Sequence, residues 1–181
     1  MGTLTRPGTV LVLVDLQEWI TALPLAPLSG PEVVTECAAL LDTFRKAGEP
    51  VVFVRYLRED GADGGADHPE TRLVDGVLPT AGEETVVKHG LDAFQGATAS
   101  GLGLHALLRT YGADSVVLAG IATPHGIAAT ATTALRLGYR AVIPTDATTA
   151  GDAHGHTTAL RELASAGAEL LPLSRILEAL G

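Results

Sequence analysis

A stretch in the middle of the chain, residues 116–131, constrains the fold more than any other part of the sequence. Residues 116–119 form an apolar run of strand composition that stops at Gly120, and an Ala/Thr/Leu-rich helix is expected from Gly126. When a strand ends at glycine and a helix follows after a short turn, the first backbone N–H groups of the helix are directed into the space above the sheet. Ligands of α/β proteins bind there, beyond the carboxyl ends of the strands. The stretch therefore predicts an α/β fold with a ligand site at this turn.

The rest of the chain alternates between strand-like and helix-like segments. Strands are expected at residues 9–15, 51–56, 85–88, 115–120, 140–145 and 169–173, and helices at 31–47, 102–111, 126–137, 153–166 and 174–180, the last capped by Ser174. Residues 18–30 and 57–79 are expected to be loops, the second forming part of an active-site rim. This alternation predicts one domain, residues 1–181, with a parallel sheet and helices on both of its faces.

Composition excludes several classes of partner. The 181 residues carry a net charge of -9, which argues against nucleic acid or an anionic membrane as a partner. A single cysteine cannot form an internal disulfide, and residues 1–8 show no signal-peptide core. No apolar run reaches the length of a membrane span. We expect a cytoplasmic protein that acts on a small molecule.

Three chemically distinctive features each follow the end of a predicted strand: Asp15, Lys88 and the turn at residues 122–126. Parallel strands place their carboxyl ends on one edge, so the three could meet in one crevice. Each also has a simpler interpretation by itself. The carboxylate could cap a loop, the lysine could keep its charge in water, and Gly126 could serve close backbone approach.

These residues, in their order and spacing, resemble the isochorismatase-like (cysteine hydrolase) superfamily. The matching motifs are Val14-Asp15-Leu16-Gln17, Val86-Val87-Lys88 with Ala93-Phe94, Gly120-Ile121-Ala122-Thr123 with Ala129-Thr130-Ala131, Leu137-Gly138-Tyr139-Arg140 and Asp146-Ala147. The resemblance covers nearly the whole chain. It implies a three-layer α/β/α fold with a six-stranded parallel sheet, and a homodimer or larger homo-oligomer.

Most members of that superfamily are amidases with an Asp–Lys–Cys triad, and the resemblance assigns roles by position. Asp15 would be the proton-handling carboxylate, and Lys88 the cation that keeps it poised. A cis peptide would join Ile121 to Ala122, with an oxyanion site formed by nearby backbone N–H groups.

The nucleophile position of the family is occupied here by Gly126. Glycine cannot form a thioester, so the covalent amidase route is closed unless another nucleophile substitutes. The chain's one cysteine, Cys37, lies in the first predicted helix and is expected to be a small apolar core residue. Thr123 carries a hydroxyl nearby, but it would need a base, and we do not favour it.

Isochorismatases proper resemble the chain at this position, because they too carry glycine there. They hydrolyse a vinyl ether without a covalent intermediate, with the aspartate as general acid. Such chemistry needs a carboxylic acid that stays protonated near neutral pH, which an apolar pocket favours. Lys88 would favour the anion instead, so the sequence leaves this balance open.

Two departures separate the chain from isochorismatases. Those enzymes have an Ala-His pair where this chain has Thr123-Pro124-His125, and an arginine two residues after the lysine where it has His89-Gly90. Isochorismate is a dianion, and a guanidinium recognises carboxylates well. Arg55, Arg58 and His89 are the candidates to replace the arginine.

The residues expected to contact substrate are Gln17, Trp19, Arg55, Phe94, Ile121, Ala122 and His125. His125 could also be a general base towards water, or a turn residue bonded to the backbone. Trp19 and Phe94 could equally be packing residues.

No metal or cofactor is expected. Asp60, Asp63, Asp67 and His68 are interpreted as a solvated acidic loop. His154 and His156 would lie on different faces of their helix.

The sequence thus predicts a hydrolase or lyase of specialised metabolism that uses Asp15 and Lys88 without a covalent nucleophile. Two alternatives stay open: a catalytically silent binding or scaffold protein of the same fold, and an amidase inactivated by a Cys→Gly change at 126.

Overall fold

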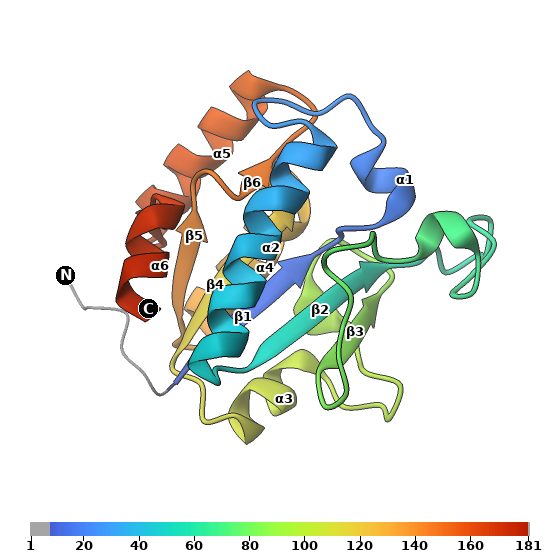
Figure 1. The fold of residues 1–181 in the computed structure, drawn as a ribbon, viewed down its shortest axis with the longest axis horizontal. Helices are drawn as coiled ribbons and strands as arrows, with labels where there is room; N and C mark the ends of the chain where they lie inside the picture. Colours follow the sequence, from blue (N-terminus) through green and yellow to red (C-terminus); the bar gives the residue numbers. More distant parts are fainter. Residues whose placement is uncertain (1–7, 181) are drawn as a thin grey trace.

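A parallel sheet forms the centre of the computed structural model, which describes residues 8–180 (Figure 1). Its strands are β1 (Thr9–Val14), β2 (Val51–Tyr56), β3 (Glu84–Lys88), β4 (Ser115–Ile121), β5 (Arg140–Pro144), β6 (Thr148–Thr149) and β7 (Glu169–Leu171). The strand order is β3-β2-β1-β4-β5-β7, and β6 pairs with β4. Every pairing between these strands is parallel. The order reverses direction between β1 and β4, which is where α/β sheets of this kind open a crevice.

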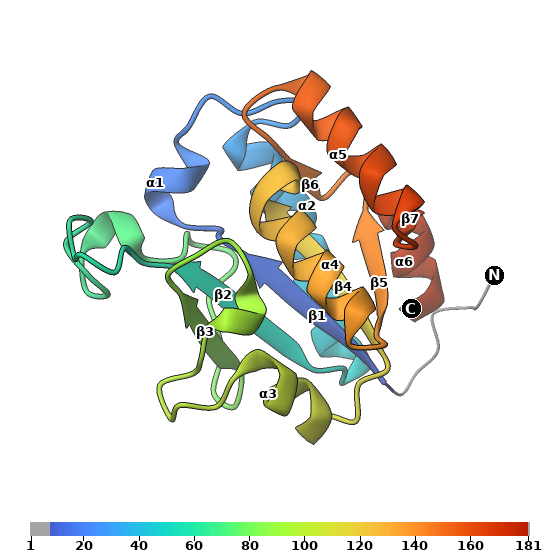
Figure 2. The same ribbon diagram turned by 180° about the vertical axis from the view of Figure 1, so that it is seen from behind.

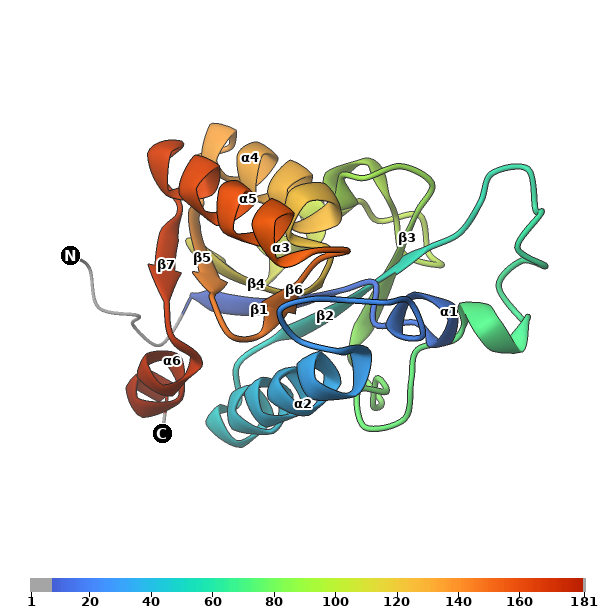
Figure 3. The ribbon, with the colours of Figure 1, turned by 90° about the horizontal axis from the view of Figure 1, so that it is seen from above.

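Helices cover both faces of the sheet. They are α1 (Glu18–Thr21), α2 (Gly30–Ala47), α3 (Leu104–Thr110), α4 (Ala128–Arg136), α5 (Ala153–Ser165) and α6 (Leu173–Leu180). Figure 3 shows α2 and α6 on one face, and α3, α4 and α5 on the other. Viewed from behind, α4 runs along the middle of the sheet (Figure 2). The expected three-layer α/β/α architecture is confirmed.

Strand β1 shows why the sequence contains continuous apolar runs. Its six residues are all buried, because helices cover the sheet on both sides. Leu11 and Leu13 pack in the cluster that includes α2 and α6, while Val10 and Val12 pack with α3, α4 and α5. The alternation of strand side chains thus supplies one apolar face to each layer of helices.

Helix α2 agrees to within one residue with the helix expected at residues 31–47. Ser29 and Glu32 form a capping box, Pro31 lies in the first turn, and Gly48 ends the helix with a φ of 71°. Cys37 is fully buried in the core below this helix, as expected, and burial raises the pKa of its thiol.

Several expectations are corrected in detail. The sheet has a seventh strand, the two-residue β6, which is too short to show an alternating pattern. Segment 18–30 contains the short helix α1, and the long loop 57–79 contains a 3₁₀ turn at Pro69–Thr71. Residues Thr123–Ile127 form a π-helical turn before α4 begins.

The predicted cap of the last helix is also wrong. Ser174 lies inside α6, which begins at Leu173, and the Leu173 N–H donates to Asp146 Oδ1 at 2.6 Å. The carboxylate of a distant turn thus takes the role expected of the serine.

No helix within residues 8–180 is long and apolar enough to cross a membrane. The first seven residues, for which we expected no signal peptide, lie outside the described part of the chain.

Candidate active site

Asp15 and Lys88 meet at the carboxyl edge of the sheet. Asp15 directly follows β1, Lys88 is the last residue of β3, and Lys88 Nζ donates to Asp15 Oδ2 at 2.7 Å. Strand β2 lies between β1 and β3, so the long lysine side chain has to reach across it. Tyr56 is the register partner of Lys88 on β2, and its ring centroid lies 5.4 Å from Lys88 Nζ. The structure therefore brings the two charged groups together, as predicted.

The pair is almost completely withdrawn from water. Asp15 is 6% exposed and Lys88 is 1% exposed. Lys88 Nζ also donates to the backbone oxygen of Gly90 at 3.2 Å. Burial raises the pKa of Asp15 to about 6, and the attraction and hydrogen bond from Lys88 offset part of that rise. The sequence left open whether burial or Lys88 has the larger effect on the pKa of Asp15, and in the structure the effect of burial is larger.

Asp15 has two further unusual features. Its backbone has a φ of 55°, the one left-handed non-glycine residue among residues 8–180. Its Oδ1 oxygen is buried and has no hydrogen-bond partner within the described residues. A buried acceptor without a donor costs free energy, so this oxygen is suited to accept a bond from a bound molecule.

The turn after β4 has the backbone that the family resemblance implies, with a cis peptide between Ile121 and Ala122. Thr123 is fully buried in this turn, and its hydroxyl donates to the Thr149 backbone oxygen at 3.0 Å. Because a hydroxyl has one proton, its 2.8 Å contact with His156 Nδ1 requires the imidazole to be the donor. Thr123 therefore anchors the turn, and its hydroxyl proton is already engaged.

Gly126 lies directly beside the acidic group. A Cβ atom at this position would lie 3.3 Å from Asp15 Oδ2 and 3.1 Å from Val14 Cγ1. A side chain at 126 would therefore start next to the carboxylate. Without one, the space beside Asp15 is open to substrate or water.

A cavity of about 450 Å³ opens onto this group of residues. Its lining consists of Asp15, Trp19, Ile20, Leu23, Pro24, Leu25, Tyr56, Lys88, Leu91, Ile121, Ala122, His125, Gly126 and Gly151. The predicted substrate-contacting residues Trp19, Ile121, Ala122 and His125 are among them.

Gln17 is placed elsewhere, because its carboxamide is buried and engaged with backbone. Its Nε2 donates to the Thr71 and Tyr56 oxygens at 2.7 and 3.0 Å, and its Oε1 accepts from the Tyr56 N–H at 2.7 Å. Gln17 thus ties the end of β2 and the long connector to the segment after β1. It does not line the cavity.

Phe94 is also not among the lining residues. Its ring stacks on Tyr139 with centroids 6.3 Å apart, in the core between the sheet and α3 and α4. The packing interpretation of Phe94 fits this position.

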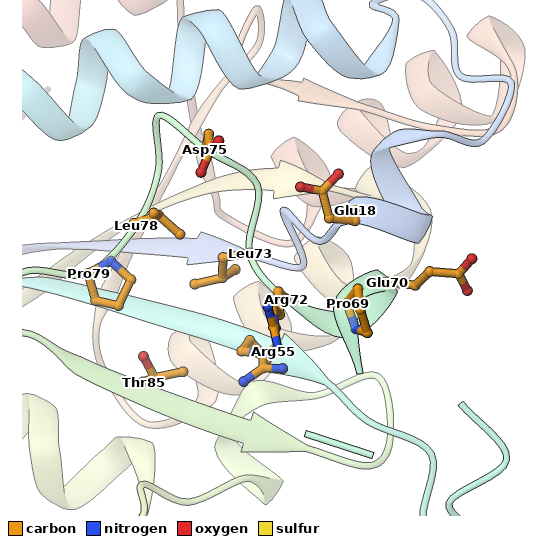
Figure 4. Close-up of a pocket in the computed structure, with 10 residues that line it drawn as sticks. All are labelled: Glu18, Arg55, Pro69, Glu70, Arg72, Leu73, Asp75, Leu78, Pro79 and Thr85. Atoms are coloured by element: carbon orange, nitrogen blue, oxygen red, sulfur yellow. The ribbon is translucent and has the colours of Figure 1, made fainter. Parts of the chain in front are cut away.

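Arg55 lines a different and larger cavity, of about 750 Å³ (Figure 4). Arg55 is not among the residues that line the Asp15 cavity, and it precedes Tyr56 on β2, where successive side chains point to opposite faces of the sheet. Arg55 donates to the backbone oxygens of Thr71 and Ala66. The larger cavity contains neither Asp15 nor Lys88, and we place the candidate active site in the smaller one.

Sequence reasoning missed most of the apolar wall of the active-site cavity. Ile20, Leu23, Pro24 and Leu25 come from segment 18–30, which has no periodicity that would assign them to a face. Tyr56 could have been found, because it ends a strand on the same edge as Asp15 and Lys88.

Comparison with known proteins agrees with the fold. A family model described as "Isochorismatase domain" matches residues 9–174. The chain is 32% identical to an uncharacterized isochorismatase family protein, YecD, of Escherichia coli O157:H7, over 99% of this chain and 100% of the relative. It is 32% identical to maleamate amidohydrolase of Pseudomonas putida, over 80% of this chain and 72% of the relative.

A solved isochorismatase family structure from Burkholderia thailandensis superposes with a TM-score of 0.85. The two share 29% sequence identity, and the match covers 98% of each chain. Together with the acid–lysine pair at the sheet edge, these similarities show that the chain belongs to the isochorismatase family of hydrolases.

Proposed function

We propose that the protein hydrolyses a small molecule without a covalent enzyme intermediate, with Asp15 as general acid. One observation carries the proposal: the buried Asp15 carboxyl, with its pKa raised to about 6, lies beside a position that has no side chain. A carboxyl with this pKa keeps a useful protonated fraction near neutral pH. Gly126 offers no group that could form a bond to substrate.

Hydrolysis of a vinyl ether illustrates the chemistry available to this arrangement. Asp15 gives its proton to the alkene carbon, and the substrate becomes an oxocarbenium ion. A water molecule adds to that ion and returns a proton, and the hemiketal collapses to a ketone and an alcohol. Lys88 offsets the charge left on Asp15, since its Nζ is already 2.7 Å from Oδ2.

The roles of the remaining cavity residues follow from their places in the lining. His125 precedes Gly126 and is suited to orient substrate or the attacking water. Trp19, Ile121 and Ala122 would contact the body of the substrate.

The Asp15→Asn variant tests this proposal, with Asp42→Asn as a control. Asp42 is an exposed carboxylate on α2 that pairs with Lys46. With a vinyl ether or other labile substrate found by screening, Asp15→Asn should lose roughly 10²- to 10⁴-fold in kcat, the usual contribution of a general acid. Unchanged turnover in Asp15→Asn would refute the role of Asp15.

An amidase inactivated by a Cys→Gly change is the second candidate. Two observations favour it. A Cβ atom at position 126 would lie 3.3 Å from Asp15 Oδ2, and the chain is similar to maleamate amidohydrolase. Assay of Gly126→Cys against a panel of carboxamides tests it, with Gly151→Cys in the same cavity as control. Amide hydrolysis by the first variant alone supports this candidate.

Assembly and compartment belong to the same proposal. We expect a homodimer or larger homo-oligomer in the cytoplasm, with a substrate from specialised metabolism. Light scattering coupled to size-exclusion chromatography measures the first of these, and a monomer would contradict it.

A further inference from the structure

Two buried polar side-chain atoms lack a hydrogen-bond partner within residues 8–180, and both belong to residues that line the active-site cavity. They are Asp15 Oδ1, an acceptor when ionised, and Trp19 Nε1, which is a donor only. Buried polar groups in native proteins are usually paired. A bound molecule with one donor and one acceptor would satisfy both atoms.

Lys88 does not supply a free positive charge to the cavity. Its Nζ is held by Asp15 Oδ2 and by the Gly90 backbone oxygen, and the Tyr56 ring lies beside it. Above the pKa of Asp15 the pair is neutral as a whole, so its attraction for an anion is weak.

The cations expected to replace the isochorismatase arginine are not in this cavity. Arg55 lines the larger cavity of Figure 4. Arg58 forms two hydrogen bonds with Asp60, at 2.9 and 2.6 Å, and it lines a separate depression with His89 that shares only Tyr56 with the active-site cavity. A carboxylate in the active-site cavity would therefore have no guanidinium partner.

Apolar side chains make up most of the cavity wall. They are Trp19, Ile20, Leu23, Pro24, Leu25, Leu91, Ile121 and Ala122. Burying an anion against such a wall without a partner is costly, whereas an uncharged ring or chain gains from contact with it.

From the two unpartnered atoms, the apolar wall and the lack of an arginine in the lining we infer that the substrate is an uncharged, largely apolar molecule that carries a hydrogen-bond donor and an acceptor. The acceptor binds the Trp19 indole N–H. The donor binds Asp15 Oδ1 while Asp15 is ionised, and once Asp15 is protonated the same oxygen donates its proton to the substrate. This inference rests on the proposed function, because it describes the substrate of the same site. It separates this chain from enzymes that take a dicarboxylate such as isochorismate.

Binding of two matched ligands tests the inference. Cyclohexanecarboxamide is neutral and has both a donor and an acceptor, while cyclohexanecarboxylate has the same shape with a negative charge. Trp19 is the chain's only tryptophan, so its fluorescence reports occupancy of this cavity directly. At pH 8 we expect the carboxamide to bind at least about tenfold more tightly, a difference worth roughly 1.4 kcal/mol.

Introducing a positive charge at the cavity checks that the cavity lining sets the preference for the uncharged ligand. Leu91 lines the cavity and is 55% exposed, so Leu91→Arg should fold and should raise the affinity for the carboxylate. Leu137→Arg is the control, because Leu137 is a 43% exposed leucine outside the lining. In calorimetry, Trp19→Phe should weaken carboxamide binding, since the indole donor is lost.

Equal or tighter binding of the carboxylate to the unmodified protein would overturn the inference. Failure of both ligands to bind would overturn it as well. Failure of the proposed function would be seen separately, as unchanged turnover in Asp15→Asn. The binding measurement does not depend on turnover.

Discussion

Lys88 Nζ lies 2.7 Å from Asp15 Oδ2 in a site where both side chains are less than a tenth exposed. Each charge is buried only because the other is present, and breaking such a pair is costly. The pair also fixes the acidity of the site, since burial raises the pKa of Asp15 while Lys88 lowers it.

Replacing Lys88 by methionine should destabilise the protein by roughly 3–5 kcal/mol at pH 8, because Asp15 is then a buried charge without a partner. The loss should be smaller at pH 5, where the Asp15 carboxyl can take up a proton. Urea unfolding at the two pH values measures both. Lys46→Met, which breaks an exposed pair on α2, should cost no more than about 0.5 kcal/mol. Equal losses at pH 5 and pH 8 would contradict the account.

The raised pKa of Asp15 predicts how stability varies with pH. The folded-state pKa of about 6 exceeds the usual aspartate value of 3.8, so between these values the folded protein binds more protons than the unfolded chain. Stability contributed by Asp15 should therefore fall as pH rises through this window, by about 3 kcal/mol in total.

The difference between unmodified protein and Asp15→Asn isolates that contribution, because asparagine does not titrate. Urea unfolding of both proteins from pH 4 to pH 7 gives the difference curve. A difference that is flat across the window, or that rises with pH, would be inconsistent with a raised pKa.

Gln17→Leu should destabilise the protein by roughly 2–5 kcal/mol. The substitution leaves the buried Tyr56 N–H without its partner and removes one donor from each of the Tyr56 and Thr71 backbone oxygens, of which the Thr71 oxygen keeps its bonds from Arg55. Gln95→Leu, at an exposed glutamine, should change stability by less than about 0.5 kcal/mol. A loss for Gln17→Leu no larger than that of the control would show that the three bonds contribute little.

The sequence predicted the frame of the site because that frame follows from topology. Parallel strands share one carboxyl edge, so their order in the sequence is enough to place Asp15 and Lys88 together. The alternating strands and helices likewise predicted the layers, because each apolar run needs cover on both sides.

Side-chain directions outside regular elements could not be predicted in the same way. Gln17 is two residues beyond Asp15, but the backbone between them is irregular, and its carboxamide turns towards Tyr56 and Thr71. The protonation of Asp15 depends on how deeply it is buried against how near Lys88 lies. Only the three-dimensional structure supplies both quantities.

Gly126→Cys should fold with a loss of about 1–3 kcal/mol. Its Cβ would lie 3.1 Å from Val14 Cγ1, so the neighbouring side chain has to shift. Gly151→Cys has open space around the new Cβ and should change stability by less than about 0.5 kcal/mol. Thermal unfolding measures both variants, and failure of Gly126→Cys to fold would show that the site has no room for a side chain.

The most direct measurement is a pH titration of the Asp15 carboxyl carbon by NMR, assigned by comparison with Asp15→Asn. The account predicts a midpoint near 6, set by burial and partly offset by Lys88. A midpoint near the usual aspartate pKa of 3.8 would contradict it, because an ordinary carboxylate cannot serve as general acid near neutral pH.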